Sequence, residues 1–213
     1  MSLWDGMKQP TEFDHLIDAI VFAANKHQGQ VRKDADHSPY ITHPMAVARA
    51  IAEIGKIGDT LIYKAAILHD TIEDTDATEE ELRQHFGEEV LQIILEVTDD
   101  KSLEKMARKR MQVVHAPSLS YPARIIKLAD KIINCQDVLQ SPPEGWTLER
   151  RRDYIQWGAD VIAQIRGTNA ALEAAFDQII TEAEEKLDFK VQPLDTIDQR
   201  PWGFDLNQMP EEE

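Results

Sequence analysis

The chain has 213 residues, one cysteine and a formal net charge of −16 at pH 7, with 42% hydrophobic and 29% charged residues. This length and composition predict one soluble domain, or one domain and a tail, with a substantial core, and the single Cys135 excludes an internal disulfide. The acidic balance disfavours nucleic-acid binding, and the apolar runs are shorter than the ~18 residues that a membrane span needs.

Helical periodicity runs through nearly the whole chain, and no segment alternates convincingly as a strand would. The first half predicts helices at about residues 13–24, 42–55, 59–70, 78–87 and 90–97. Thr42 is the predicted cap of the second helix, and Thr78 and Glu81 have the spacing of a capping box. The second half predicts a helix capped by Ser102 and further helices at about 122–139, 147–167 and 169–187. We therefore expect a single all-α domain of about nine helices.

The sequence changes character after the last predicted helix. Residues 189–213 contain prolines, show little periodicity and end in acidic residues. We expect an acidic, irregular tail without a core of its own, following a domain of residues 1–188. The composition leaves open whether Trp202 and Phe204 pack against the domain or against a partner.

The third predicted helix is apolar almost all round, because only Lys64 interrupts the apolar residues from 61 to 68. Such a helix is buried in the middle of a domain, so His69 and Asp70 at its end are buried as well. A buried carboxylate needs a positive partner, and a divalent metal ion is a compact one. The alternative is that His69 bonds to a carbonyl and Asp70 caps a neighbouring helix.

Two other helices supply further candidate ligands. His43 lies in the first turn of the second predicted helix, and Asp130 and Asn134 lie four residues apart on the helix at 122–139. The polar residues of that helix share one narrow strip, which either faces solvent or lines a pocket for a metal and an anion. The complete predicted ligand set is His43, His69, Asp70 and Asp130.

This order of H, HD and D resembles the HD superfamily of metal-dependent phosphohydrolases. The phrases "AANKHQGQVRKDADHSPYITHP", "AAILHDTIEDTDAT" and "RIIKLADKIINCQDV" resemble one branch closely, the hydrolase domain of RelA/SpoT-type alarmone enzymes and the stand-alone small alarmone hydrolases. The matching phrases span about residues 13–168. The resemblance implies an HD-domain fold and removal of pyrophosphate from the ribose 3′ position of ppGpp or pppGpp, giving GDP or GTP.

The resemblance also implies a role for individual residues. Mn²⁺, or another divalent metal, would be held by the four ligands named above, with Glu73 and Asp74 as an acidic pair beside the reacting water. Without the resemblance, these two acids are equally well explained as loop residues, and their spacing does not show which is the base. The predicted substrate-binding residues are Arg32, Lys33, Lys101, Asn134 and Tyr154. The basic run at residues 105–110 is interpreted as a solvated helix face.

Two alternative functions stay open. One is an HD phosphohydrolase for another phosphorylated nucleotide, such as NADPH with its 2′-phosphate. The other is a non-catalytic module that binds alarmone, although the chain keeps every predicted ligand and both acids.

The expected partner is a small nucleotide, and the sequence leaves the oligomeric state open. Since only a tail follows the last helix, we expect hydrolysis without synthetase activity. The N-terminus lacks the features of a secretory signal, so we expect a cytoplasmic protein.

Overall fold

The computed structural model describes residues 11–34 and 36–203, which form helices and no named strand. The α-helices are α1 (Glu12–Lys26), α2 (Thr42–Glu53), α3 (Thr60–Leu68), α4 (Thr71–Asp74), α5 (Glu79–Phe86), α6 (Glu88–Val97), α7 (Lys105–His115), α8 (Tyr121–Gln140), α9 (Leu148–Ala163) and α10 (Ala170–Leu187). Two 3₁₀ helices, η1 (Ala116–Ser118) and η2 (Leu194–Gln199), complete the described part. The all-α prediction is confirmed, and the helix beyond the expected nine is the short α4.

Local sequence signals account for some helix ends and not for others. The capping box of α5 forms as predicted, because Thr78 and Glu81 exchange side-chain to backbone hydrogen bonds. Thr42 is not a cap, since α2 begins at that residue and its hydroxyl donates to the carbonyl of Pro39. Ser102 is not a cap either, because α7 begins at Lys105. Both predictions were wrong because each helix begins at a different residue from the one that the cap implies.

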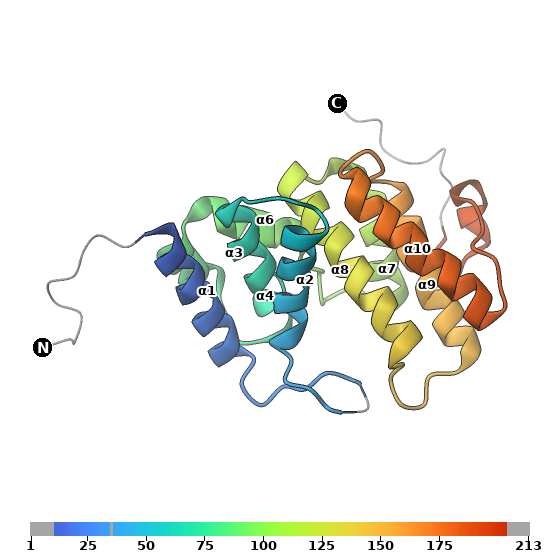
Figure 1. Ribbon diagram of the computed structural model, residues 1–213, viewed down its shortest axis with the longest axis horizontal. Helices are drawn as coiled ribbons and strands as arrows, with labels where there is room; N and C mark the ends of the chain where they lie inside the picture. Colours follow the sequence, from blue (N-terminus) through green and yellow to red (C-terminus); the bar gives the residue numbers. More distant parts are fainter. Residues whose placement is uncertain (1–10, 35, 204–213) are drawn as a thin grey trace, which may run out of the picture.

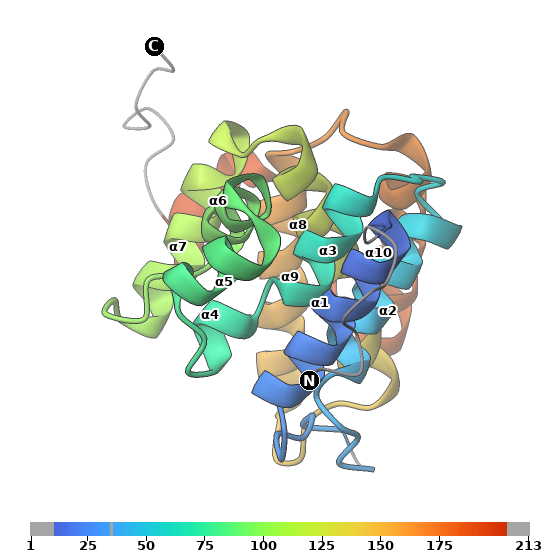
Figure 2. The same cartoon turned by 90° about the vertical axis from the view of Figure 1, so that its left-hand side faces the viewer.

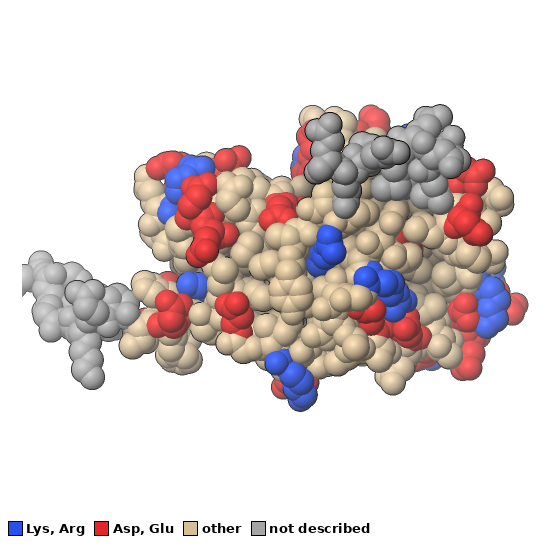
Figure 3. All heavy atoms as spheres, turned by 90° about the horizontal axis from the view of Figure 1, so that it is seen from above, with Lys and Arg blue, Asp and Glu red and all other residues tan. Residues whose placement is uncertain are grey.

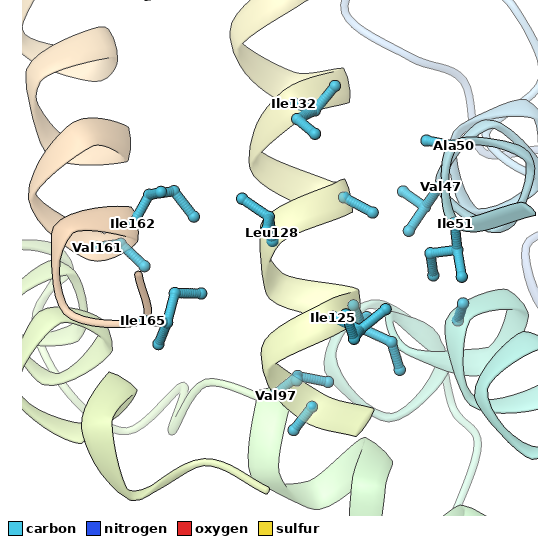
Figure 4. Close-up of a cluster of buried hydrophobic side chains, with 14 of the residues drawn as sticks. Val47, Ala50, Ile51, Val97, Ile125, Leu128, Ile132, Val161, Ile162 and Ile165 are labelled. Carbon is cyan, nitrogen blue, oxygen red and sulfur yellow. The ribbon is translucent and has the colours of Figure 1, made fainter. Parts of the chain in front are cut away.

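The core is arranged around α8. Figure 1 shows α1 at one end of the molecule, α9 and α10 at the other, and α8 between them. In the close-up of Figure 4, Leu128 and Ile132 of α8 lie between Val47 of α2 and Ile162 of α9. Because α8 is covered on both sides by apolar neighbours, its polar residues are carried into the interior of the domain.

The third helix is buried, as its sequence predicts. Helix α3 packs against α1, α2, α6 and α8, and its residues Ala65, Ala66 and Leu68 are 0% exposed. The helix ends at Leu68, and the chain turns through His69 and Asp70 into α4. The hydroxyl of Thr71 donates to the carbonyl of Leu68 at 2.6 Å and closes this turn. The turn therefore presents two polar side chains at the end of a buried helix.

The described part of the C-terminal tail, residues 189–203, packs on the domain. Ile197 is 0% exposed and Trp202 is 1% exposed, and the indole Nε1 of Trp202 donates to Asp160 Oδ2 at 3.0 Å. In Figure 2 this red segment lies beside α7. The sequence left open whether Trp202 packs against the domain or against a partner, and in the structure its indole packs against the domain. Phe204 lies outside the described residues.

The surface carries charges of both signs. On the face drawn in Figure 3, basic and acidic side chains are interspersed. Within residues 11–34 and 36–203, no helix combines the length and apolar character needed to cross a membrane.

The central position of α8 leads to a stability prediction. Leu128→Ala is expected to lower the free energy of unfolding by about 2–5 kcal/mol, because it opens a cavity in the core. Leu148→Ala is the matched control, since Leu148 is 47% exposed, and it should change stability by about 0.5 kcal/mol or less. Urea unfolding of both variants measures the difference, and equal losses would contradict the central role of α8.

Candidate active site

Three segments far apart in the sequence bring two histidines and an aspartate together. His43 lies in the first turn of α2, His69 follows α3, and Asp130 lies in the middle of α8. One ligand atom of each lies within 4.8 Å of the others. His43 Nε2 is 3.1 Å from Asp130 Oδ1, and His69 Nε2 is 3.8 Å from the same oxygen. This cluster is a candidate metal centre.

Asp70 lies beside this trio and contacts both histidines through separate oxygens. Its Oδ1 is 3.2 Å from His69 Nε2, and its Oδ2 is 3.7 Å from His43 Nε2. The hydroxyl of Tyr40 donates to the same Oδ2 at 2.6 Å. All four predicted ligands therefore gather in one cluster, although Asp70 is turned partly toward Tyr40.

The ring of His69 is set up to ligate a cation. Its Nδ1 is 2.8 Å from the carbonyl of Ala66, and since a carbonyl only accepts, Nδ1 carries the proton. The other nitrogen, Nε2, is buried, has no hydrogen-bond partner in the described structure and faces Asp70 and Asp130. A ring nitrogen that faces two carboxylates needs either a proton or a metal cation between them, and the donor set fits a divalent metal.

The charges of this cluster shift the pKa values of its members. Burial by itself would lower the pKa of His69, but the carboxylates of Asp70 and Asp130 outweigh burial and raise the pKa to about 9. Burial likewise opposes ionisation of Asp130, yet Lys131 and the two histidines hold its pKa well below the ordinary value. The carboxylates thus stay ionised in the interior and attract positive charge.

The acidic pair lies on α4, next to this centre. Burial raises the pKa of Glu73, although its Oε2 accepts a hydrogen bond from the backbone N–H of Asp99 at 3.0 Å. Asp74 Oδ1 accepts from Lys101 Nζ at 2.7 Å, and the same ammonium is 3.4 Å from Glu73. Lys101, predicted to bind substrate, is therefore held by the acidic pair and does not line the two cavities described next.

A cavity of about 280 Å³ contains the metal ligands and the acidic pair. Five basic side chains also line this cavity, and they are called the basic wall below: Lys105, Arg108, Lys109, Lys127 and Lys131. The polar strip of α8 consequently lines a pocket. The interpretation of residues 105–110 as a solvated face was wrong for Arg108 and Lys109, which are partly buried because α7 turns them toward the cavity, whereas Lys105 lines the cavity but is exposed.

A second cavity, of about 560 Å³, adjoins the first and shares Tyr40, His43, Asp74, Asn134 and Tyr154 with it. Four of the five predicted substrate-binding residues line it: Arg32, Lys33, Asn134 and Tyr154. Trp146 also lines it and lies 5.5 Å, centroid to centroid, from the ring of Tyr154. The Arg32 guanidinium pairs with Asp137, and Asn134 Nδ2 donates to Asp130 Oδ1 at 2.6 Å. This cavity combines aromatic surface with cationic groups.

The sequence analysis missed Tyr40. Its ring lies 4.7 Å from that of His27 and 5.9 Å from that of His43, and its hydroxyl is also 3.4 Å from Asp74 Oδ2. The hydroxyl thus joins a metal ligand to the acidic pair. The only signal in the sequence is its position three residues before His43, directly ahead of α2.

Comparisons with known proteins agree with this geometry. The family model of the HD domain matches residues 19–166. The chain is 48% identical over 167 residues to the guanosine-3′,5′-bis(diphosphate) 3′-pyrophosphohydrolase MESH1 of Xenopus tropicalis, covering 78% of this chain and 93% of the relative. Identity to MESH1 of Homo sapiens is 45% over 172 residues, covering 81% and 96%. The solved structure of a metazoan ortholog of SpoT that hydrolyzes ppGpp matches with a TM-score of 0.78 and 41% identity, covering 83% of this chain and 98% of that one.

The raised pKa of His69 leads to a pH prediction for the metal-free protein. Between pH 6.5 and 8 the unfolded chain loses the proton of His69 while the folded protein, with a pKa of about 9, keeps it. The stabilisation is complete below pH 6.5 and falls as pH rises, by roughly 1–2 kcal/mol over this window. A bound divalent cation replaces the proton, so the fall should disappear.

Thermal unfolding from pH 6.5 to 8, with chelator or with Mn²⁺, measures this effect. The window stops at pH 8 because burial lowers the pKa of Lys109 to about 8, which reverses the slope at higher pH. Equal slopes with and without metal would contradict a cation at His69.

The contact of Tyr40 with Asp70 leads to a second prediction. Tyr40→Phe removes one hydroxyl and is expected to weaken Mn²⁺ binding about 10-fold, since groups that orient ligands typically have effects of this size. Isothermal titration of metal into the protein measures the change. Tyr121→Phe is the control, because Tyr121 is 54% exposed. An equal loss of metal affinity in both variants would contradict a role of the Tyr40 hydroxyl in orienting Asp70.

Proposed function

This chain belongs to the HD-domain family, and we propose that it is a metal-dependent 3′-pyrophosphohydrolase of ppGpp and pppGpp that yields GDP or GTP and pyrophosphate. The observation that carries the phosphohydrolase chemistry is the metal-ligand cluster together with the basic wall inside one cavity. The nucleotide is inferred from the relatives, which carry this activity in their names at 45–48% identity.

The proposed cation is Mn²⁺, held by His43, His69, Asp70 and Asp130. Two imidazoles and two carboxylates suit Mn²⁺, and they suit other divalent metals equally. When bound there, the cation lowers the pKa of a water molecule and polarises a phosphoryl oxygen. Side chains of this chain would carry out the other steps, which are proton transfer, orientation of the water and binding of the substrate.

Hydrolysis requires a proton acceptor beside the attacking water. The water oxygen forms a bond to the phosphorus that carries the ribose 3′ oxygen, the bond from phosphorus to that oxygen breaks, and the 3′ oxygen takes up a proton. Glu73 is the proposed acceptor, because burial raises its pKa toward the range in which a general base works. Asp74, held by Lys101, would orient the water.

The substrate carries two diphosphates, and the two cavities offer separate places for them and for the base. The basic wall of the smaller cavity suits the 3′-diphosphate, since ammonium and guanidinium groups neutralise phosphate oxygens. The larger cavity suits the nucleoside, with the rings of Trp146 and Tyr154 beside the base and Arg32 and Lys33 beside the remaining phosphates.

The proposal includes a cytoplasmic location and a part in the alarmone-dependent stringent response. The single cysteine, Cys135, is buried and free, which suits a reducing compartment. The partner is the nucleotide, and neither nucleic acid nor membrane is part of the proposal.

Product analysis tests the function. Purified protein is incubated with ppGpp, with and without Mn²⁺, and GDP and pyrophosphate are measured by anion-exchange chromatography. We expect both products only with metal. Glu73→Gln should lower kcat on the order of 100-fold or more while metal binding is kept. Asp70→Ala should lose both metal binding and turnover.

Glu80→Gln is the matched control, because Glu80 is an exposed acid on the neighbouring α5, and it should turn over like wild type. NADPH is tested in parallel. Release of phosphate from NADPH with ppGpp left intact would favour the alternative phosphohydrolase, and tight ppGpp binding without any product would favour the non-catalytic module.

A further inference from the structure

Lys109 of α7 lies on the basic wall of the metal-bearing cavity and has an aromatic environment. Its Nζ is 4.8 Å from the ring centroid of Trp157 and 5.7 Å from that of Tyr154. No carboxylate of the described residues forms an ion pair with this ammonium at 4.0 Å or less, unlike Lys101 and Lys131. The charge of Lys109 is therefore free for an anion in the cavity.

The third ring around this ammonium comes from the far end of the chain. The ring centroid of Trp202 lies 4.6 Å from Lys109 Nζ, closer than the other two. Trp202 is 1% exposed, and its carbonyl accepts a hydrogen bond from Arg110 Nε at 3.3 Å. The HD-domain model ends at residue 166, so this ring comes from outside the region that the family model covers.

A buried ion pair fastens the C-terminal segment, residues 189–203, in this position. Arg200 Nε is 2.9 Å from Asp160 Oδ2, and the side chains are 6% and 1% exposed. The indole of Trp202 donates to the same oxygen at 3.0 Å, and Gln156 Nε2 donates to the other at 2.9 Å. Breaking such a buried pair is costly, so the segment holds the indole in one place.

We propose that Trp202 is a positioning residue of the active site, which holds the ammonium of Lys109 against the wall of the metal-bearing cavity so that it binds a phosphate group of the substrate. The proposal rests on the phosphohydrolase function proposed above. An ammonium held over aromatic faces gives up no donor to a competing carboxylate. Its side chain is also already ordered before the anion arrives, which reduces the entropy lost on binding.

A double-mutant cycle separates positioning from general stability. Trp202→Leu is expected to raise the KM for ppGpp about 5-fold with kcat within about 2-fold, because a cation–π contact of this kind is worth about 1 kcal/mol. Trp202→Phe keeps an aromatic face and should restore most of the affinity. In the Lys109→Met background, Trp202→Leu should have no further effect on KM.

Val191→Ala is the control for a merely structural role. Val191 lies in the same segment and packs against the core but does not line the metal-bearing cavity, so Val191→Ala should lower the thermal midpoint and leave KM unchanged. An unchanged KM in Trp202→Leu, or an equal rise in the Lys109→Met background, would overturn the proposal.

Binding of inorganic pyrophosphate, measured by calorimetry with Mn²⁺ present, repeats the cycle without turnover. If wild-type protein leaves ppGpp intact, the proposed function fails, while the same non-additive pattern in the pyrophosphate Kd would still support the role of Trp202. Additive effects on this Kd, or no pyrophosphate binding by wild type, would overturn it. If Trp202→Leu does not fold, Trp202→Met, whose flexible side chain fills irregular space but also lacks an aromatic face, takes its place in the cycle.

Discussion

The structure depends on two carboxylates, Asp70 and Asp130, that remain ionised in the interior of a helical domain. Burial opposes their charge, so the surrounding groups must supply positive charge. His43 provides a nitrogen atom from α2, and His69 provides one from the same turn as Asp70, with its imidazole oriented by the carbonyl of Ala66. A divalent cation satisfies the whole cluster at once, which a single proton does only in part. Helices α3 and α8 are largely buried in the core, and the end of α3 and the middle of α8 present these groups to the same cavity.

The distribution of charge follows from this centre. The chain as a whole carries a net charge of −16, yet five basic side chains line the cavity at the centre. A highly charged anionic substrate would be repelled by the average surface, and the five basic side chains offset this negative charge locally where the phosphates are expected. The acidic groups that line the cavity are the predicted ligands Asp70 and Asp130 together with Glu73, Asp74 and Asp99.

The C-terminal segment connects stability with the site. Asp160 accepts hydrogen bonds from Arg200 and Trp202. These bonds fix the C-terminal segment so that Trp202 contacts Lys109 and Arg110 of α7. Helix α7 carries three of the five residues of the basic wall but contacts few other elements, chiefly α9 and η1. A segment that packs on α7 and α9 together therefore supports the part of the cavity with the least support from the core.

The sequence by itself determined the all-α class and the buried third helix, and it predicted the four side chains that the structure brings together as a candidate metal centre. Helical periodicity and capping signals are local, and the phrases around His43, His69 and Asp130 are long enough to identify the family. Only the tertiary structure decided that the polar strip of α8 lines a pocket and that Lys101 pairs with the acidic residues. It also decided the places of Tyr40, Lys109 and Trp202, because a ring packed on an ammonium 93 residues away leaves no periodic trace in the chain. Contacts of this kind depend on how helices pack, and packing is set by the whole core rather than by any one segment.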